Sequence, residues 1–272
     1  MSASRSRPAD VLLDLLRSVG ARGHSVRFLI NAGALFGFTE NTIRVALSRL
    51  GARGLVDSPA RGRYRLAEGT DALNEFVERW RLGEQRVRAW RPGRWLIAHT
   101  TSDSPEDRWV LETLGFRTVR EGLHTRPDNL VLSSDALVAQ AVSLGAADDL
   151  LLIEGRMQAD VAQVWSESWR PEDLLEDYRS LLRRLAESAA RLPALPRDRA
   201  RLESFRLGGE AIHCLAKDPL LPAELIDTAP RAQLVEAMLD YDRLGKAVWA
   251  HDRDAEAQTL PTAQLASAQG FS

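Results

Sequence analysis

The sequence predicts an α+β protein of several domains. Its 272 residues are enough for two or three modest domains, and 44% hydrophobic and 27% charged residues are ordinary for a globular protein. The apolar periodicity changes from helical to strand-like near Trp90 and returns to helical after residue 157. The charge is also divided, because residues 1–66 hold eleven arginines and four acidic residues while the whole chain carries −2. The basic N-terminal part is therefore the candidate for binding an anion.

Three helices are predicted at the N-terminus. Apolar residues recur every three or four positions over 8–19, and a second short helix fits residues 26–35. Thr39 is the predicted N-cap of a third helix that stops at Gly51. One face of this helix is expected to be buried; it consists of Ile43, Ala46, Leu47 and Leu50.

A basic hairpin is predicted next. Residues 55–58 and 63–66 form its strands around a turn at 59–62, and Tyr64 and Leu66 alternate with Arg63 and Arg65. The alternation places the two arginines on one face. Three helices followed by this hairpin predict a winged helix-turn-helix domain over residues 1–69, in which the third helix enters the major groove of DNA.

The middle of the chain is predicted to hold a linker helix and a ferredoxin-like domain. A helix over Thr70–Arg88 lies in the linker, residues 70–89. Residues 90–157 then give strands at 94–100, 116–121, 123–126 and 148–157 and helices at 104–115 and 134–145, with a further short strand expected at 129–134. The order βαββαβ is that of a ferredoxin-like sandwich.

The last third of the chain is predicted to be helical. Three helices begin at Pro171, Arg197 and Pro230, with apolar residues at helical spacing, so residues 158–254 form a C-terminal helical domain. Residues 255–272 are rich in Ala, Gln, Ser and Thr without periodicity, and we expect a disordered tail there.

Several stretches in this order resemble the PaaX-like transcriptional regulators. They are TENTIRVALSRLGARGLV with a wing ending in YRL, then WRPGRWLIAHT and LGFRTVREGLHTRP, and finally KDPLLPAELI. The resemblance implies a homodimeric DNA-binding repressor of a catabolic operon. It also implies a central domain similar to the CRISPR-associated small endoribonuclease fold, and a C-terminal domain for effector binding and dimerisation. The effector is expected to be a small acyl- or aryl-CoA-like molecule that releases the protein from its operator.

The third helix and the hairpin supply the expected DNA contacts. If its apolar face is buried, the helix turns outward side chains whose chemistry suits base edges. These are Asn41, Arg44, Val45 and Ser48. Other residues are better placed for phosphates. These are Thr39, Thr42, Arg49, Arg61, Arg63 and Arg65.

A CoA-like effector needs cations for its phosphates and an apolar slot for its acyl group. Two clusters offer this mixture and are the candidate effector site. They are Arg91, Arg94 and Trp95 at the entry of the central domain, and Trp165, Trp169 and Arg170 beyond it.

An enzyme is not expected. The chain has no HExxH, GxSxG, GxGxxG or P-loop motif, and its five histidines share no metal spacing, so neither catalytic residues, nor a metal, nor a cofactor are assigned. The single cysteine, Cys214, excludes a disulfide within one chain and fits a reducing cytosol. No apolar run approaches the roughly 18 residues of a membrane span, and no secretory signal is recognised. We therefore expect a cytoplasmic protein without a membrane partner.

Two alternatives remain. The central domain could act as a metal-dependent nuclease, although the acidic residue nearest to its first strand is Asp103, in the following loop. The winged helix could instead contact another protein rather than DNA. The second alternative predicts that changes at Asn41 and Arg44 leave nucleic-acid affinity unchanged.

Overall fold

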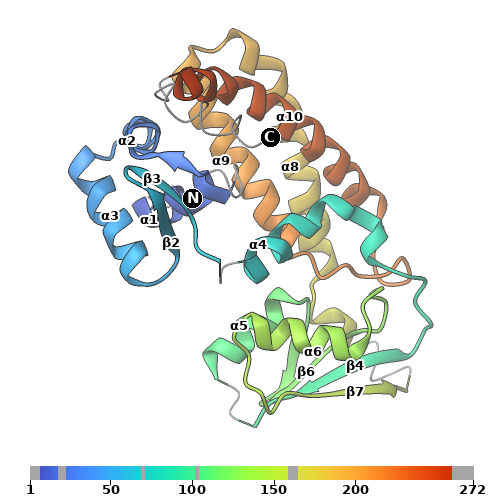
Figure 1. Ribbon diagram of the computed structural model, residues 1–272. Helices are drawn as coiled ribbons and strands as arrows, with labels where there is room; N and C mark the ends of the chain where they lie inside the picture. The colour runs from blue at the N-terminus through green and yellow to red at the C-terminus, as the bar shows by residue number, and fades with distance from the viewer. Residues whose placement is uncertain (1–6, 18–22, 69–70, 102–103, 159–164, 259–272) are drawn as a thin grey trace, which may run out of the picture. The chain divides into compact units, whose positions relative to one another are not determined.

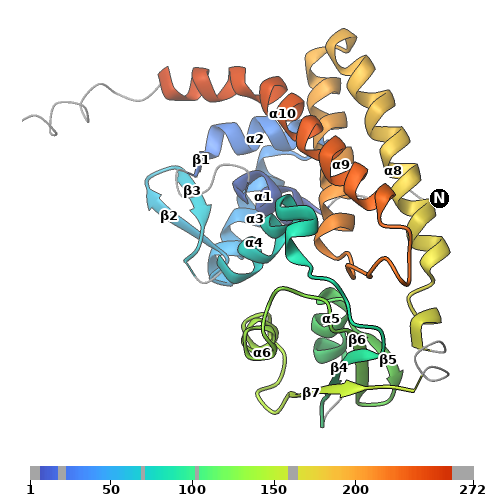
Figure 2. The same ribbon diagram turned by 90° about the vertical axis from the view of Figure 1, so that its right-hand side faces the viewer.

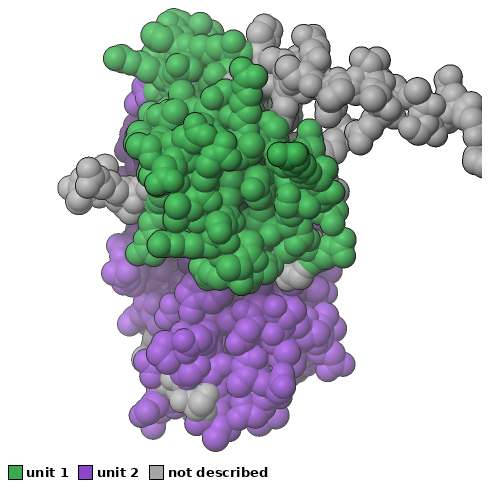
Figure 3. Space-filling view, turned by 60° about the vertical axis from the view of Figure 1, so that its left-hand side comes forward, with its two compact units in different colours: residues 1–70, 193–205, 243–272 green, residues 71–192, 206–242 purple. Residues whose placement is uncertain are grey.

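The computed structural model describes residues 7–17, 23–68, 71–101, 104–158 and 165–258. The predicted α+β class is confirmed. The described residues form helices and two antiparallel sheets, of which one has the strand order β1-β3-β2 and the other β5-β6-β4-β7 (Figure 1). The chain divides into two compact units, coloured separately in Figure 3. Unit 1 comprises residues 1–70, 193–205 and 243–272, and unit 2 comprises residues 71–192 and 206–242.

Unit 1 begins with the predicted three helices and hairpin. Its N-terminal elements are α1 (Pro8–Arg17), β1 (His24–Ser25), α2 (Val26–Leu35), α3 (Glu40–Ala52), β2 (Val56–Ala60) and β3 (Arg63–Leu66). The predicted bounds of the second helix are confirmed, and the third helix begins directly after Thr39. Strand β1 was not predicted, because two residues carry no periodicity; it pairs with β3 through His24 and Tyr64.

The core of unit 1 includes residues from far along the sequence. Leu12, Leu29 and Ile43, from α1, α2 and α3, are fully buried. They share one apolar cluster with Trp249 of α10 (Ala229–Gln258), against which Phe205 of α9 (Arg197–Ala216) also packs. Burial of aromatic side chains is a major source of stability. The core of unit 1 is therefore completed by the C-terminal helices.

Unit 2 contains the four-stranded sheet. Its elements up to the last strand are β4 (Arg94–His99), α5 (Pro105–Thr113), β5 (Arg117–Arg120), β6 (Leu123–Pro127), α6 (Ser134–Ser143) and β7 (Leu151–Arg156). Leu96 and Ala98 of β4 share a buried cluster with residues of α5 and α6, so both helices cover the same face of the sheet (Figure 2).

The strand expected at residues 129–134 is absent. Only Leu130 forms an isolated bridge, to Val87, and Ser133 already caps α6 by accepting a hydrogen bond from the Ala136 N–H. Strand β6 is flanked by β5 and β4, so no sheet edge is left beside it for this segment. Within the apolar run at residues 130–132, only Leu130 is buried, and Val131 is 59% exposed.

The linker is also less regular than expected. Instead of one helix over Thr70–Arg88, the chain forms α4 (Asp71–Glu78) and a 3₁₀ segment, η2 (Arg79–Arg86). Gly83 adopts φ 49° and ψ −127°, which no residue of an α-helix adopts. A Cβ at this position would lie 3.2 Å from Val235 Cγ1. The close approach to α10 therefore explains both the glycine and the interruption.

Three long helices follow the sheet. They are α8 (Pro171–Arg191), which continues into η3 (Leu192–Ala194), and then α9 and α10. Arg184 of α8 binds Glu210 of α9 through two contacts of 2.5 and 2.6 Å. Helix α10 continues to Gln258, so residues 255–258 of the expected disordered tail are helical; residues 259–272 lie outside the described part. None of the helices in the described ranges combines the length and apolarity that a membrane crossing requires.

Replacing Gly209 by alanine is expected to stabilise the protein. Gly209 lies inside α9, and a Cβ there would meet no atom within 4 Å, so the packing does not require a glycine. Alanine in a helix interior is favoured over glycine by about 0.5–1 kcal/mol. Thermal unfolding should show a midpoint about 2 °C above wild type. A lower midpoint would show that the native state needs the flexibility of this glycine.

Candidate nucleic-acid interface

Helices α2 and α3 approach each other closely at Gly33. A Cβ on Gly33 would lie 2.5 Å from Ile43 Cδ1 and 2.7 Å from Ile43 Cγ1, so only glycine fits opposite this isoleucine. The chain reverses between the helices at Gly37, which has φ 82°. Gly33 was not singled out from the sequence, although a glycine inside a predicted helix is a known sign of close packing. It fixes the position of α3 relative to α2.

Thr39 caps α3 as predicted. Its hydroxyl accepts a hydrogen bond from the Thr42 N–H at 3.2 Å and lies 2.8 Å from the Thr42 hydroxyl. The Thr39 carbonyl accepts the Ile43 N–H at 3.1 Å. Thr39 and Thr42 therefore hold the first turn of the helix, whose positive end favours an anion such as a phosphate.

Helix α3 has one buried face and one exposed face. Ile43, Leu47 and Leu50 are at most 1% exposed, and Ala46 is half-buried. The opposite face consists of exposed side chains; these are Asn41, Arg44, Val45, Ser48 and Arg49. Val45 is 41% exposed, although exposure of an apolar side chain to water is unfavourable. An exposed valine among polar residues is suited to contact an apolar group such as a thymine methyl.

The two arginines of this face differ in their partners. Arg44 binds Glu40 one turn earlier, with its Nε and Nη2 each 2.8 Å from the Glu40 Oε1. Both side chains are more than half exposed, so this pair is weak and exchanges readily for another anion. Arg49 is exposed and has no acidic partner among the described residues. Arg49 is thus the cation of α3 most available to a phosphate.

The hairpin presents its three arginines unequally. Arg61 is exposed at the turn between β2 and β3. Arg63 is half-buried and donates to the Gly23 carbonyl at 3.1 Å. Arg65 donates to Glu68 at 3.2 Å and lies 4.0 Å from Asp57. Arg63 and Arg65 therefore hold the hairpin to its surroundings as well as adding positive charge.

The candidate effector tryptophans gather in one cluster. The Trp95 ring stacks on Trp169 with ring centroids 5.8 Å apart and meets Trp165 edge-on at 6.0 Å. Trp90 completes the cluster, at 5.7 Å from Trp95. Trp95 and Trp169 are buried, while Trp165 is half-buried. The cluster is packed as part of a core, with Trp165 as its accessible edge.

The candidate effector arginines have different surroundings. Arg94 lies 3.4 Å from Glu154 and 3.9 Å from Asp128. Arg170, at the start of α8 with φ 47°, binds Asp173 at 3.1 Å. Arg91 is exposed without an acidic partner in the described ranges.

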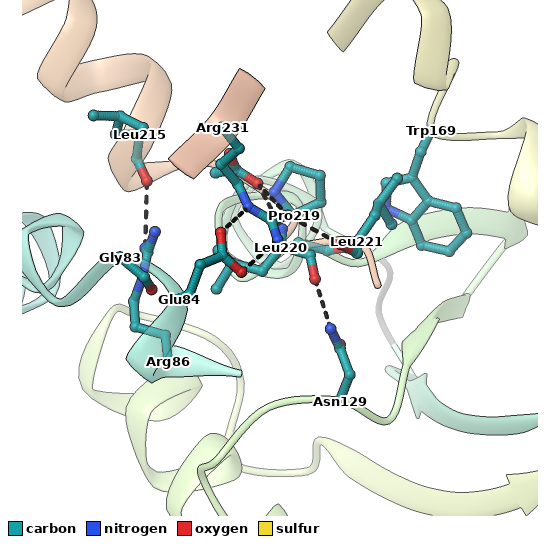
Figure 4. A network of polar contacts seen from close by, with 12 residues as sticks. Gly83, Glu84, Arg86, Asn129, Trp169, Leu215, Pro219, Leu220, Leu221 and Arg231 are labelled. Carbon is teal, nitrogen blue, oxygen red and sulfur yellow. Dashed lines mark hydrogen bonds and ion pairs between the residues drawn. The ribbon is translucent and has the colours of Figure 1, made fainter. Parts of the chain in front are cut away.

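A network of buried arginines in unit 2 was missed from the sequence (Figure 4). It surrounds the segment Asp218–Leu221, inside the stretch KDPLLPAELI. Arg231 donates to the Leu221 carbonyl at 3.0 Å and binds Glu84 through contacts of 2.8 and 2.9 Å. Asn129 donates to the Leu220 carbonyl at 2.6 Å. The segment is thereby tied both to the sheet side and to α10.

Arg126 belongs to the same network. It donates to the carbonyls of Leu114, Pro127 and Pro219 and is 1% exposed. Burial lowers its pKa to about 9, against the opposing charges of Asp128 and Asp218. Burial also raises the pKa of the Cys214 thiol to about 12, which leaves this cysteine unreactive at neutral pH. Arginines spread over the sequence gave no signal of their convergence.

The described residues contain no cluster of three or more His, Cys, Asp or Glu side chains that could hold a metal ion. Asp103, the acidic residue considered for a nuclease, lies outside the described part of the chain.

Comparison with known proteins gives a family match for the N-terminal part of the chain. Residues 7–70 match the family model of PaaX-like proteins, so the resemblance seen in the sequence is confirmed there. This match suggests a transcriptional regulator, and it covers α1 to β3.

A solved structure extends the likeness to nearly the whole chain. The uncharacterized protein Rv0674 from Mycobacterium tuberculosis is 27% identical, with 93% of this chain and 100% of that chain covered and a TM-score of 0.58. The described fold therefore has a counterpart among solved structures. A search of curated proteins gave no match.

Proposed function

We propose that the protein is a DNA-binding transcriptional regulator, a homodimeric repressor whose N-terminal residues form a winged helix-turn-helix. The exposed face of α3 carries the proposal. Asn41, Arg44, Val45 and Ser48 lie on it, opposite the buried Ile43 face, in the chain segment that matches the PaaX-like family. Arginine suits guanine, asparagine suits adenine and valine suits the thymine methyl.

Phosphate contacts would fix this helix on the duplex. The N-terminal turn of α3 at Thr39 and Thr42, the exposed Arg49 and the wing residue Arg61 are available for this role. The high positive charge of residues 1–66 supports it. Arg63 and Arg65 contribute charge while bracing the wing.

The rest of the chain is proposed to sense an effector. The strand order β5-β6-β4-β7, with α5 and α6 on one face, supports a ferredoxin-like central domain, and α8 to α10 would form the helical effector domain. Trp165, at the edge of the tryptophan cluster, and the exposed Arg91 are the most accessible residues for an acyl- or aryl-CoA-like molecule. Its binding would favour a dimer in which the two reading helices no longer match the half-sites of the operator.

Fluorescence anisotropy of the purified protein tests DNA binding. The probes are the duplex upstream of its own gene and a scrambled duplex of equal length. Arg49→Ala is expected to weaken binding to both duplexes and to reduce the dependence of affinity on salt by about one counterion, because Arg49 meets a phosphate. Arg44→Ala is expected to weaken binding mainly to the upstream duplex, by about 1–3 kcal/mol.

Arg183→Ala is the matched control, because Arg183 is exposed on α8 and its loss changes the charge equally. Binding that is unchanged in Arg44→Ala and Arg49→Ala would contradict the reading role of α3. It would favour the winged helix as a contact surface for another protein.

A further inference from the structure

Among the described residues, strand β7 pairs only with β4 and is an edge strand of the four-stranded sheet (Figure 1). It pairs with β4 in unbroken register over six residues, from Arg94 opposite Arg156 to His99 opposite Leu151. The other edge strand, β5, has four residues and a register shift between Thr118 and Arg120. Short, irregular, charged edges discourage pairing with another strand, whereas regular edges favour it. Of the two edges, β7 is the one open to a further strand.

The backbone of β7 offers hydrogen bonds at this edge. The Met157 N–H donates to the Gly93 carbonyl at 2.9 Å, and alternation along an antiparallel ladder then directs the backbone groups of Ile153 and Gly155 towards β4. Those of Leu152, Glu154 and Arg156 point away from β4. They form a row of donors and acceptors suited to pair with another strand.

Two large apolar side chains of β7 are exposed. Leu151 is 53% exposed and Ile153 is 45% exposed. They lie on the sheet face opposite α5 and α6, because Leu152, which points the other way, packs in the core beneath those helices. A second strand laid along this edge would cover part of this apolar surface.

The sequence of β7 is complementary to itself. We propose that β7 pairs antiparallel with β7 of a second copy of this chain, about a twofold axis at Gly155. This inference rests on the homodimer of the proposed function and names its interface. Glu154 then faces the second copy's Arg156, and Arg156 faces the second copy's Glu154. On the apolar face, Ile153 meets the second copy's Met157.

The neighbouring residues support this register. Arg156 is exposed and has no acidic partner in the described part of its own chain, so it is available to Glu154 of the second copy. Met157 lies on the same face as Gly155, since a Cβ on Gly155 would be 3.5 Å from both Met157 Cε and Ile97 Cδ1. An axis at residue 154 would instead set Glu154 against itself, and like charges directly opposite are destabilising.

A charge exchange across the axis tests the pairing without DNA. In sedimentation experiments the wild type should have twice its chain mass of 30.2 kDa. Arg156→Glu should raise the dimer dissociation constant at least about tenfold, because both cross-strand pairs become repulsive. Glu154→Arg should do the same. An equimolar mixture of these two variants should dimerise again, since every pair across the axis is then of opposite charge. Arg120→Glu on β5 is the matched control and should remain dimeric.

A cysteine on the axis tests the register itself. In a Cys214→Ser background, Gly155→Cys should give a covalent dimer on mild oxidation. Gly155 and Gly155 of the second copy would form a non-hydrogen-bonded pair, and directly opposite residues of such a pair lie within disulfide reach. Thr118 is exposed on β5, and Thr118→Cys in the same background should not give a covalent dimer. A monomeric wild type at about 100 μM, a mixture that stays monomeric, or equal cross-linking at both positions would each overturn the inference. Sequence-specific DNA binding by such a monomer would overturn the homodimer but would leave the DNA-binding role of α3 standing.

Discussion

Replacing Arg126 by methionine is expected to lower the free energy of unfolding by about 3–5 kcal/mol. The guanidinium lies in the interior of unit 2 and donates to three backbone carbonyls that belong to separate parts of the chain. Methionine has a similar length but no donor, so it would leave the carbonyls of Leu114 and Pro219 buried without their partner. The stability lost with the hydrogen bonds should therefore exceed the stability gained by removing a buried charge.

Urea unfolding followed by tryptophan fluorescence measures this effect. Arg120→Met is the matched control, because Arg120 is exposed on the neighbouring strand β5 and should change stability by less than 0.5 kcal/mol, as is usual for surface sites. If the free energy of unfolding of Arg126→Met is within about 1 kcal/mol of wild type, water or rearranged donors satisfy the carbonyls. Arg126 then holds residues 218–221 less strongly than its contacts indicate.

Gly33→Ala is expected to destabilise unit 1 by about 1–3 kcal/mol and to weaken DNA binding at the same time. The added Cβ would overlap Ile43, whose branched side chain has little rotamer freedom in a helix. Relief of the overlap requires α2 and α3 to move apart, and α3 carries the proposed reading face. Stability is measured by thermal unfolding and DNA affinity by anisotropy.

A double-mutant cycle separates the effect of this overlap on stability from any other effect of alanine at position 33. Ile43→Ala removes both atoms that the new Cβ would overlap, at the cost of a cavity. The double variant should therefore be more stable than the sum of the two single changes predicts. Additive effects would show that Gly33 and Ile43 do not determine the spacing of the two helices.

Local features of the fold could be predicted where short-range rules decide. The N-cap at Thr39, the bounds of α2 and the burial of Ile43, Leu47 and Leu50 all follow from periodicity and capping chemistry within one turn or two. The exposure of Asn41 and Arg44 follows from the same periodicity. The exposed face of α3 could therefore be predicted from the sequence alone.

Features that depend on distant contacts could not be predicted. The interruption of the linker at Gly83 arises from Val235, about 150 positions later in the chain. The apolar run at Leu130 was interpreted as a strand, because periodicity does not show whether a sheet has a free edge to receive it. The convergence of Arg126 and Arg231 on Asp218–Leu221 likewise appears only in three dimensions.

The shared core of unit 1 has a consequence for dissecting the protein. Phe28 packs near Trp249 and Phe36 packs against Phe205, so two aromatic side chains of the N-terminal residues depend on partners beyond residue 200. A fragment ending at residue 70 would expose them to water and would tend to aggregate. The N-terminal helices and the hairpin are thus not expected to fold as an independent fragment. A gene fusion that keeps these elements folded has to carry the ends of α9 and α10 along with them, and a premature stop codon before Trp249 would remove part of the core of unit 1.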